Sequence, residues 1–140
     1  MANTLRLSDT LSGLALFADL SRAQLEGVAH TFEEALFEEG ERVLRRGLRG
    51  TGFYLIIDGQ AAVRVGDSVI AQLGRGEFFG EISALLDEPP SADIVAETSL
   101  RCVVLPGPAL RGFLVSNPTV AVRMLQTQAM RLRTTLEWMT

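Results

Sequence analysis

The sequence predicts a mainly β protein of the α+β class, an antiparallel β-roll or jelly-roll barrel flanked by N-terminal helices and a long C-terminal helix. Three observations support this. A helix-start signal lies near residue 21, short strand-like runs separated by turn dipeptides fill residues 32–105, and a long helical pattern follows Asn117. Short, evenly spaced strands are typical of barrels and jelly rolls. We expect one domain over residues 1–140, a length that suffices to bury a core.

The N-terminal helices are expected over residues 11–31. Ser21 is followed three residues later by Gln24, the spacing of a capping box, in which each side chain accepts a hydrogen bond from the other residue's backbone N–H. The apolar residues that follow share one face of the expected helix: Leu25, Val28 and Ala29.

The β-roll is expected over residues 32–105. Turn dipeptides recur at Glu39-Gly40, Asp58-Gly59 and Gly66-Asp67. Between the turns apolar residues tend to alternate, as Val63 and Val65 do, and alternation of this kind predicts strands with one buried face.

The C-terminal helices are expected over residues 106–140, with the last one starting at Asn117 as cap and Pro118 as first helical residue. Apolar residues then recur at spacings of three and four, which is the a/d pattern of a coiled coil. We call this set the seam: Val122, Leu125, Ala129, Leu132, Leu136 and Met139.

Two interpretations of the seam stay open. It either pairs two copies of the chain in a homodimer or packs on the chain's own barrel. A second stripe, Val120 and Met124, could make the barrel contact and leave the seam for a partner. The charged residues between the seam positions are expected to face water: Arg123, Arg131, Arg133 and Glu137.

Composition narrows the function classes. The chain is 47% hydrophobic and 21% charged, as ordinary soluble globular proteins are, and its net charge of −4 argues against a direct nucleic-acid-binding surface. The single histidine, His30, cannot supply the ligand set of a cupin-type metal site, so no metal is expected. The single cysteine, Cys102, lies in an apolar run and is expected to be buried.

The sequence also predicts a cytoplasmic location. Its first residues lack a convincing signal peptide, and no stretch reaches the roughly 18 apolar residues of a membrane span. A single cysteine suits a reducing compartment.

Residues 79–96 (FGEISALLDEPPSADIVA) carry the strongest functional signal. The segment opens with Phe79, Gly80 and Glu81 and continues into a short apolar helical stretch. Glycine lets a backbone approach a ligand closely, and the start of a helix directs free N–H groups at an anion. The carboxylate of Glu81 could accept hydrogen bonds from sugar hydroxyls.

This segment resembles the phosphate-binding cassette of cyclic nucleotide-binding domains, as in cAMP receptor proteins and the regulatory subunits of cAMP-dependent kinases. In that family the cassette opens with F-G-E and ends with P-R-[ST]-A before a strand. Residues 11–20 (LSGLALFADL) are similar to the family's L-F-x-x-L-S opening, and residues 54–65 match its Y-L-I-x-x-G-x-x-x-V hairpin. The resemblance covers residues 11 to about 135.

The resemblance implies nucleotide contacts within a cassette of residues 79–92. Backbone amides at its start and the Ser91 hydroxyl would hold the phosphate, Glu81 would hold the ribose, and Trp138 is one candidate to stack on the base. The implied nucleotide-binding residues are Phe79, Gly80, Glu81, Ile82, Ser83, Ser91 and Ala92.

The chain departs from the family pattern at Pro90, which stands where the family has the arginine that neutralises the cyclic phosphate. A hydrogen bond to a charged group contributes roughly 1.5–3 kcal/mol, so its loss predicts binding weaker by about one to two decades. Asp93, expected to share a strand face with Ser91, adds a repulsive charge. Arg75 is the candidate compensating cation, the alternative being a solvated turn arginine.

The expected function is a regulatory or sensor domain that binds cAMP or cGMP, most simply cAMP with weakened affinity, and that acts on an effector protein or domain. No catalytic residue is expected, because no second carboxylate or nucleophile accompanies Glu81. The alternative is a degenerate domain that no longer binds cyclic nucleotide and serves in dimerisation or protein docking. A transcription factor of the same superfamily would need a helix-turn-helix domain after the long helix.

Overall fold

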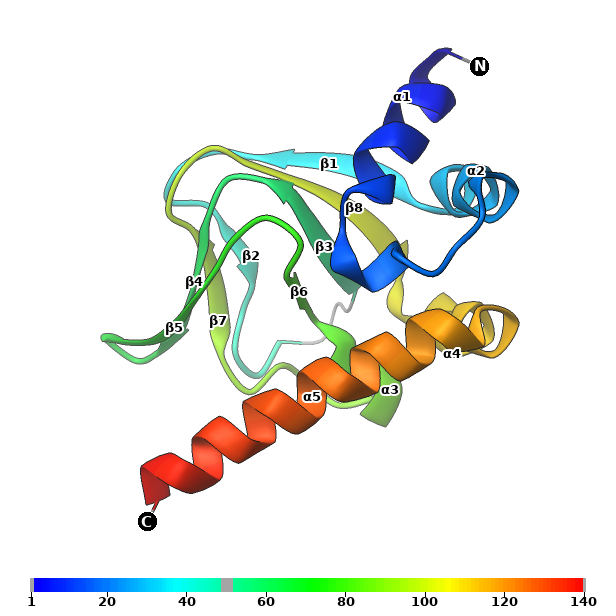
Figure 1. Ribbon diagram of the computed structural model, residues 1–140. Helices are drawn as coiled ribbons and strands as arrows, with labels where there is room; N and C mark the ends of the chain where they lie inside the picture. Colours follow the sequence, from blue (N-terminus) through cyan, green and yellow to red (C-terminus); the bar gives the residue numbers. More distant parts are fainter. Residues whose placement is uncertain (1, 49–51, 140) are drawn as a thin grey trace.

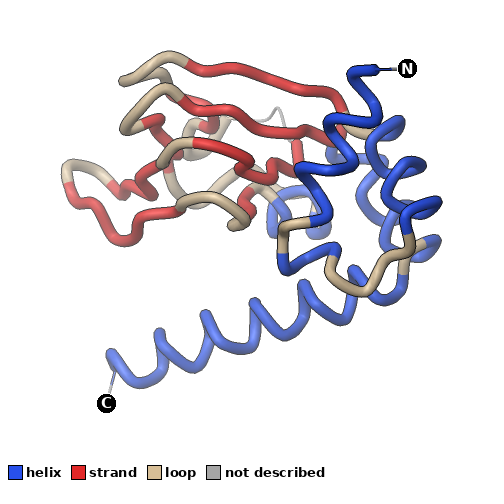
Figure 2. The backbone as a smooth tube through the Cα atoms, turned by 45° about the horizontal axis from the view of Figure 1, so that its top comes forward, coloured by secondary structure: helices blue, strands red, loops and turns tan. Residues whose placement is uncertain are grey.

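A computed structural model describes residues 2–48 and 52–139, with side chains from residue 6 onward. Two four-stranded sheets form a β-roll, and the helices gather at one end and along one side of it (Figures 1 and 2). All strand pairs are antiparallel. The expected fold class is therefore confirmed.

The sheets interleave segments that lie far apart in the sequence. The first sheet, in spatial order, consists of β1 (Glu33–Phe37), β8 (Leu100–Pro106), β3 (Gly52–Asp58) and β6 (Phe78–Phe79). The second consists of β2 (Arg42–Leu44), β7 (Asp93–Ala96), β4 (Ala61–Val65) and β5 (Ser68–Leu73).

The expected hairpin over residues 54–65 is wrong. The two runs form β3 and β4, but β3 belongs to the first sheet and β4 to the second, and the true hairpin joins β4 to β5. The chain crosses between the sheets at Gly59, whose φ is +94°. A Cβ at Gly59 would collide with the carbonyl oxygen of Ser99, so this crossing requires glycine.

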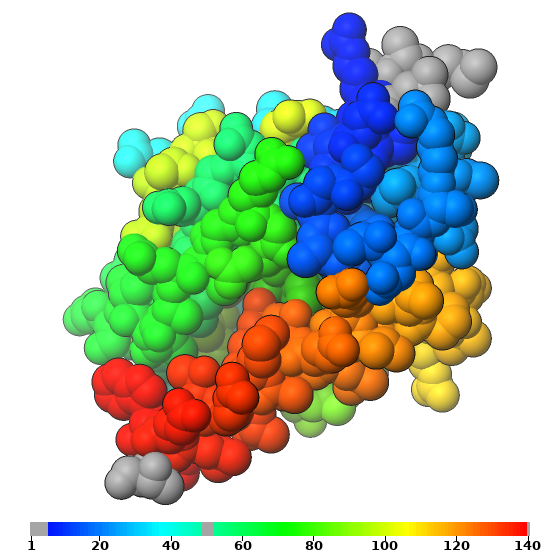
Figure 3. All heavy atoms as spheres, in the orientation of Figure 1, coloured from blue at the N-terminus to red at the C-terminus, as the bar shows by residue number. Residues whose placement is uncertain are grey.

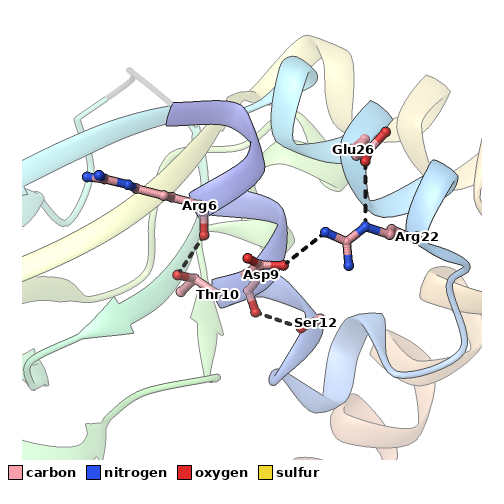
Figure 4. A network of polar contacts seen from close by, with 6 residues as sticks. All are labelled: Arg6, Asp9, Thr10, Ser12, Arg22 and Glu26. Atoms are coloured by element: carbon pink, nitrogen blue, oxygen red, sulfur yellow. Dashed lines mark hydrogen bonds and ion pairs between the residues drawn. The ribbon is translucent and has the colours of Figure 1, made fainter. Parts of the chain in front are cut away.

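The N-terminal helices are α1 (Ala2–Ser12), the short 3-10 helix η1 (Ala15–Phe17) and α2 (Arg22–Thr31). The capping box of α2 is confirmed: Ser21 Oγ accepts from the Gln24 N–H at 3.2 Å, and Gln24 Oε1 accepts from the Ser21 N–H at 2.8 Å. Arg22 ties the two longer helices together, because its guanidinium lies 3.6 Å from Asp9 of α1 and 3.8 Å from Glu26 of α2 (Figure 4).

Two clusters of buried apolar side chains form the core. The larger one lies between the helices and the first sheet. Phe32 meets its phenylalanine neighbours edge to face, and its ring centroid is 5.1 Å from that of Phe113 at 83°. The smaller cluster fills the roll and includes Cys102, which is fully buried as expected.

The C-terminal part consists of α4 (Gly107–Ser116) and α5 (Pro118–Met139). The long helix begins at Pro118 as expected, but the Asn117 side chain donates to the Phe113 carbonyl at 3.0 Å and so closes α4. Val120 and Met124 are buried in the larger cluster, where α5 contacts η1 and α4, so this stripe packs within the domain itself.

The seam faces away from the barrel. Its larger side chains keep half or more of their surface exposed: 53% at Val122, 68% at Leu125, 60% at Leu132, 52% at Leu136 and 78% at Met139. Figures 1 and 3 show α5 crossing the side of the roll, with its last turns at the edge of the molecule. The seam is therefore not a self-packing surface in this structure.

Within residues 2–48 and 52–139, no helix combines the length and the apolar character that crossing a membrane requires.

Candidate functional site

The cassette begins where β6 ends. Phe79 is buried and its ring stacks on Tyr54 of β3, with centroids 4.8 Å apart and planes 5° from parallel. Gly80 follows with φ +87°, and a Cβ there would collide with the carbonyl oxygen of Gly52. The packing of the cassette against β3 thus requires glycine at position 80 whether or not a ligand is bound.

The helix of the cassette is α3 (Glu81–Leu86), and it places the implied contact residues in different surroundings. Glu81 and Ser83 are buried, whereas Ile82 is 56% exposed. The Ser83 carbonyl accepts the Glu88 N–H at 3.1 Å across the left-handed residue Asp87, and this bond closes the helix.

Glu81 is held from the C-terminal helix. Only 3% of the residue is exposed, and its carboxylate accepts from Arg131 of α5 at 3.1 Å. The same guanidinium donates to the Phe78 carbonyl at 2.9 Å and lies over the Phe78 ring, 4.6 Å from its centroid. Arg131, expected to face water, instead links α5 to both sides of the Phe78–Glu81 turn.

Burial raises the pKa of Glu81 above its usual range. Desolvation is the largest cause, and the charge of Arg131, hydrogen bonds from the backbone and the side chain of Gln128 offset only part of it. The carboxylate therefore has a stronger affinity for donors and protons than a solvated glutamate.

Arg131 and Gln128 are site residues that we did not infer from the sequence. A signal was present, because the buried stripe of Val120 and Met124 continues at helical spacing to Gln128 and then Arg131. A charged residue in line with an apolar stripe suggests a buried partner, and the only nearby carboxylate in the cassette opening is Glu81.

The far end of the cassette contacts the connection that follows β2. Pro90 is buried, and its carbonyl accepts the Gly47 N–H at 2.9 Å. Ser91 is exposed and precedes β7, which begins at Asp93, so these two residues do not share a strand face. The Asp93 carboxylate accepts the Arg46 N–H at 2.7 Å, which offsets part of the repulsion expected toward a phosphate.

Arg75 is not close to the cassette. Its guanidinium donates to the carbonyl of Ile57 at 3.5 Å, near the end of β3, whereas Gly80 packs against Gly52 at the start of that strand. Five residues of strand separate the two points, roughly 16 Å at about 3.3 Å per residue. The structure therefore does not bring Arg75 together with the other implied site residues.

A separate cavity of about 150 Å³ lies between η1, the β5–β6 turn and α5. Its lining includes Phe78, Gln126 and Thr127, and none of the implied cassette residues. Small-molecule sites usually occupy about 300–1,000 Å³, so this cavity is small for a nucleotide. In the described part of the chain, no group of three or more His, Cys, Asp or Glu side chains is arranged to hold a metal ion.

The fold and the cassette have known counterparts. The chain is 30% identical over 121 residues to a cGMP-dependent protein kinase of Plasmodium berghei, covering 86% of this chain but 14% of that protein. The chain thus spans about one seventh of that relative's length. A cAMP-bound PfPKA-R structure superposes with a TM-score of 0.83 at 23% identity, covering 99% of this chain and 48% of that one.

A bacterial structure is similar as well. The catabolite activator protein of Thermus thermophilus gives a TM-score of 0.76 at 28% identity, covering 88% of this chain and 61% of that one. The family model of the cyclic nucleotide-binding domain matches residues 34–117, which include all of the cassette. With the sheet order, the cassette and the family match in agreement, the chain belongs to the cyclic nucleotide-binding domain family.

Proposed function

We propose that this domain is a sensor that binds a cyclic nucleotide at the cassette and passes the binding event to α5. The observation that carries the proposal is the Glu81–Arg131 link. The residue expected to hold the ribose is the same residue that holds the C-terminal helix. A ligand that engages the Glu81 carboxylate therefore changes the anchoring of α5.

The expected contacts follow the cassette. Backbone amides of residues 80–83 and the Ser91 hydroxyl hold the phosphate, and Glu81 holds the ribose. Because differential affinity for two states shifts their populations, a nucleotide that binds one arrangement of α5 better favours that arrangement. The domain is regulatory and not catalytic.

Affinity is expected to be weaker than is usual for the family. Pro90 offers neither a guanidinium nor an N–H, and the loss of one charge-assisted contact corresponds to about one to two decades. We propose cAMP as the first ligand to test. cGMP is the second, because the Plasmodium berghei relative is a cGMP-dependent kinase.

A second candidate function is a degenerate domain that keeps the fold for dimerisation or docking. The loss of the family's arginine favours it, since the buried Pro90 that stands there carries no charge toward a phosphate. Under either function, we propose that the exposed seam pairs two copies in a homodimer and that the domain acts in the cytoplasm on an effector protein or domain.

Calorimetric titration of the purified protein with cAMP and with cGMP tests the main proposal. Binding of either nucleotide, abolished by Glu81→Ala in a protein that remains folded, supports the sensor. If neither nucleotide gives a binding signal at millimolar concentration, the degenerate domain is the function that the result supports.

A further inference from the structure

The turn that follows β2 brings two arginines to the end of the cassette. Residues 45–48 form a turn in which the Leu48 N–H donates to the Arg45 carbonyl at 3.2 Å and Gly47 adopts φ +78°. Glycine favours this left-handed conformation, so the turn geometry is built into the sequence.

Two long-range hydrogen bonds fix the turn against the cassette. The Gly47 N–H donates to the Pro90 carbonyl at 2.9 Å, and the Arg46 N–H donates to Asp93 Oδ1 at 2.7 Å. The Pro90 carbonyl belongs to the peptide bond that joins Pro90 to Ser91. The turn therefore lies beside the peptide bond that leads into Ser91, the residue whose hydroxyl is expected to hold a phosphate.

The side chains of Arg45 and Arg46 are exposed, and neither makes a hydrogen bond or an ion pair with any residue that the structure describes. Both guanidinium groups are thus available to a ligand. Arginine suits phosphate because its planar fork of donors matches the phosphate oxygens and its charge does not titrate near neutral pH.

Other charged groups also lie near this turn. Asp93 is negative, but it already accepts the Arg46 N–H and lies opposite Arg64 of β4 in the strand register. Asp87 and Glu88 of the cassette are negative and exposed. Among the residues that the structure describes, Arg45 and Arg46 are the arginines on the turn that is hydrogen-bonded to Pro90 and Asp93.

We infer that Arg45 and Arg46 supply the positive charge toward the nucleotide phosphate that Pro90 cannot supply. The inference rests on the proposed nucleotide binding and assigns its phosphate recognition to a different segment of the chain. Because these arginines are exposed and solvated, they restore only part of the lost interaction.

The experiment compares a ligand with a phosphate and one without. Titrations with cAMP and with adenosine are carried out on the wild type, Arg45→Ala/Arg46→Ala, Arg45→Lys/Arg46→Lys and the control Arg111→Ala, an exposed arginine on α4. The wild type should bind cAMP more tightly than adenosine. The alanine pair should lower cAMP affinity by about tenfold or more and leave adenosine affinity within about twofold.

The lysine pair should recover part of the cAMP affinity, because it keeps the charge and loses only the fork geometry. Arg111→Ala should change neither ligand. The inference is overturned if cAMP affinity is unchanged in the alanine pair, or if both ligands weaken equally, which would indicate a structural effect. If the wild type binds neither ligand, the proposed function fails together with the inference. If cAMP binds the alanine pair as tightly as the wild type, only the inference fails.

Discussion

Arg131 Nη1 lies 3.1 Å from Glu81 Oε1, across 50 residues of sequence, and this contact joins the last helix to the first residue of α3. Only 4% of the Glu81 side chain is exposed, whereas 33% of the Arg131 side chain is. The carboxylate thus depends on the guanidinium for its charge partner, while the guanidinium keeps access to water. Loss of Arg131 should therefore affect the site more than its own exposure suggests.

Arg131→Ala should destabilise the fold and loosen α5. Removing the guanidinium leaves the Glu81 carboxylate buried without its charge partner and frees the Phe78 carbonyl, a loss of about 1–3 kcal/mol in the free energy of unfolding. Urea denaturation followed by circular dichroism measures it. Arg133→Ala is the matched control, since that side chain is 72% exposed and its loss should fall within about 0.5 kcal/mol. Equal effects of the two substitutions would contradict a special role for Arg131.

Stability should depend on pH through Glu81. Burial raises the pKa of Glu81 above its ordinary value of 4.5, so the folded state binds the proton more tightly than the unfolded state does. The stability that Glu81 confers relative to Glu81→Gln is therefore fully present below pH 4.5 and is lost as pH rises through the folded-state pKa. Urea unfolding of both proteins across this range measures the difference, and a difference that grows with pH would mean that the pKa is lowered.

Pro90→Arg should strengthen cAMP binding by about one to two decades, because it restores a charge-assisted contact to the phosphate. The substitution keeps the carbonyl that accepts the Gly47 N–H. Pro89→Arg is the matched control, an exposed neighbour where the same charge should change affinity little. Calorimetry on both variants decides, and an equal gain in the two would point to general electrostatic attraction.

Replacing Leu125 and Leu132 together with Glu tests the seam. Both side chains are more than half exposed in the single chain, so the variant should remain folded by circular dichroism. In a homodimer the new charges would meet across an apolar contact and give a monomer by light scattering. Thr134→Glu, exposed and outside the seam, should leave the assembly unchanged. A wild-type protein that is monomeric at high concentration rules out the dimer.

Cys102 should be chemically inert in the folded protein. Burial raises the pKa of its thiol to about 12, so almost no thiolate is present near neutral pH, and the side chain is fully buried. Dithiodipyridine should react with the protein only as fast as the protein unfolds, and at once in concentrated urea. Rapid reaction of one thiol per chain under native conditions would show that the roll opens around Cys102.

Local signals in the sequence predicted local structure well. The Ser21–Gln24 box, the start of α5 at Pro118 and the short helix after Gly80 are each set by a few neighbouring residues. The pairing of strands was harder to predict. Residues 54–65 look like one hairpin, yet the tight packing of Gly59 against Ser99 sends the two strands into different sheets, and no local pattern encodes that contact.

The candidate site likewise combines residues that are contiguous in the sequence with residues that only the fold brings together. The cassette residues were recognisable because they are contiguous, whereas Arg131 and the turn of residues 45–48 reach the cassette only through the fold. Arg75 is close to the cassette in sequence but distant in space, because the two lie near opposite ends of β3. Proximity in sequence therefore does not place Arg75 beside the cassette, and the turn of residues 45–48 is our proposed alternative.

Because α5 is anchored through its first part, a rotation of the helix moves its last turns the most. The helix has 22 residues, and its fixed points lie in its first two thirds, at Val120, Met124 and Arg131. At about 1.5 Å per residue, a rotation of roughly 10° about Val120 would carry Met139 sideways by about 5 Å. The same rotation moves Arg131, which lies about 16 Å from Val120 along the helix, by about 3 Å. A displacement at the contact with Glu81 is thus larger by a factor of about 1.7 at Met139, so the last turns of α5 are where a displacement in this domain is most easily detected.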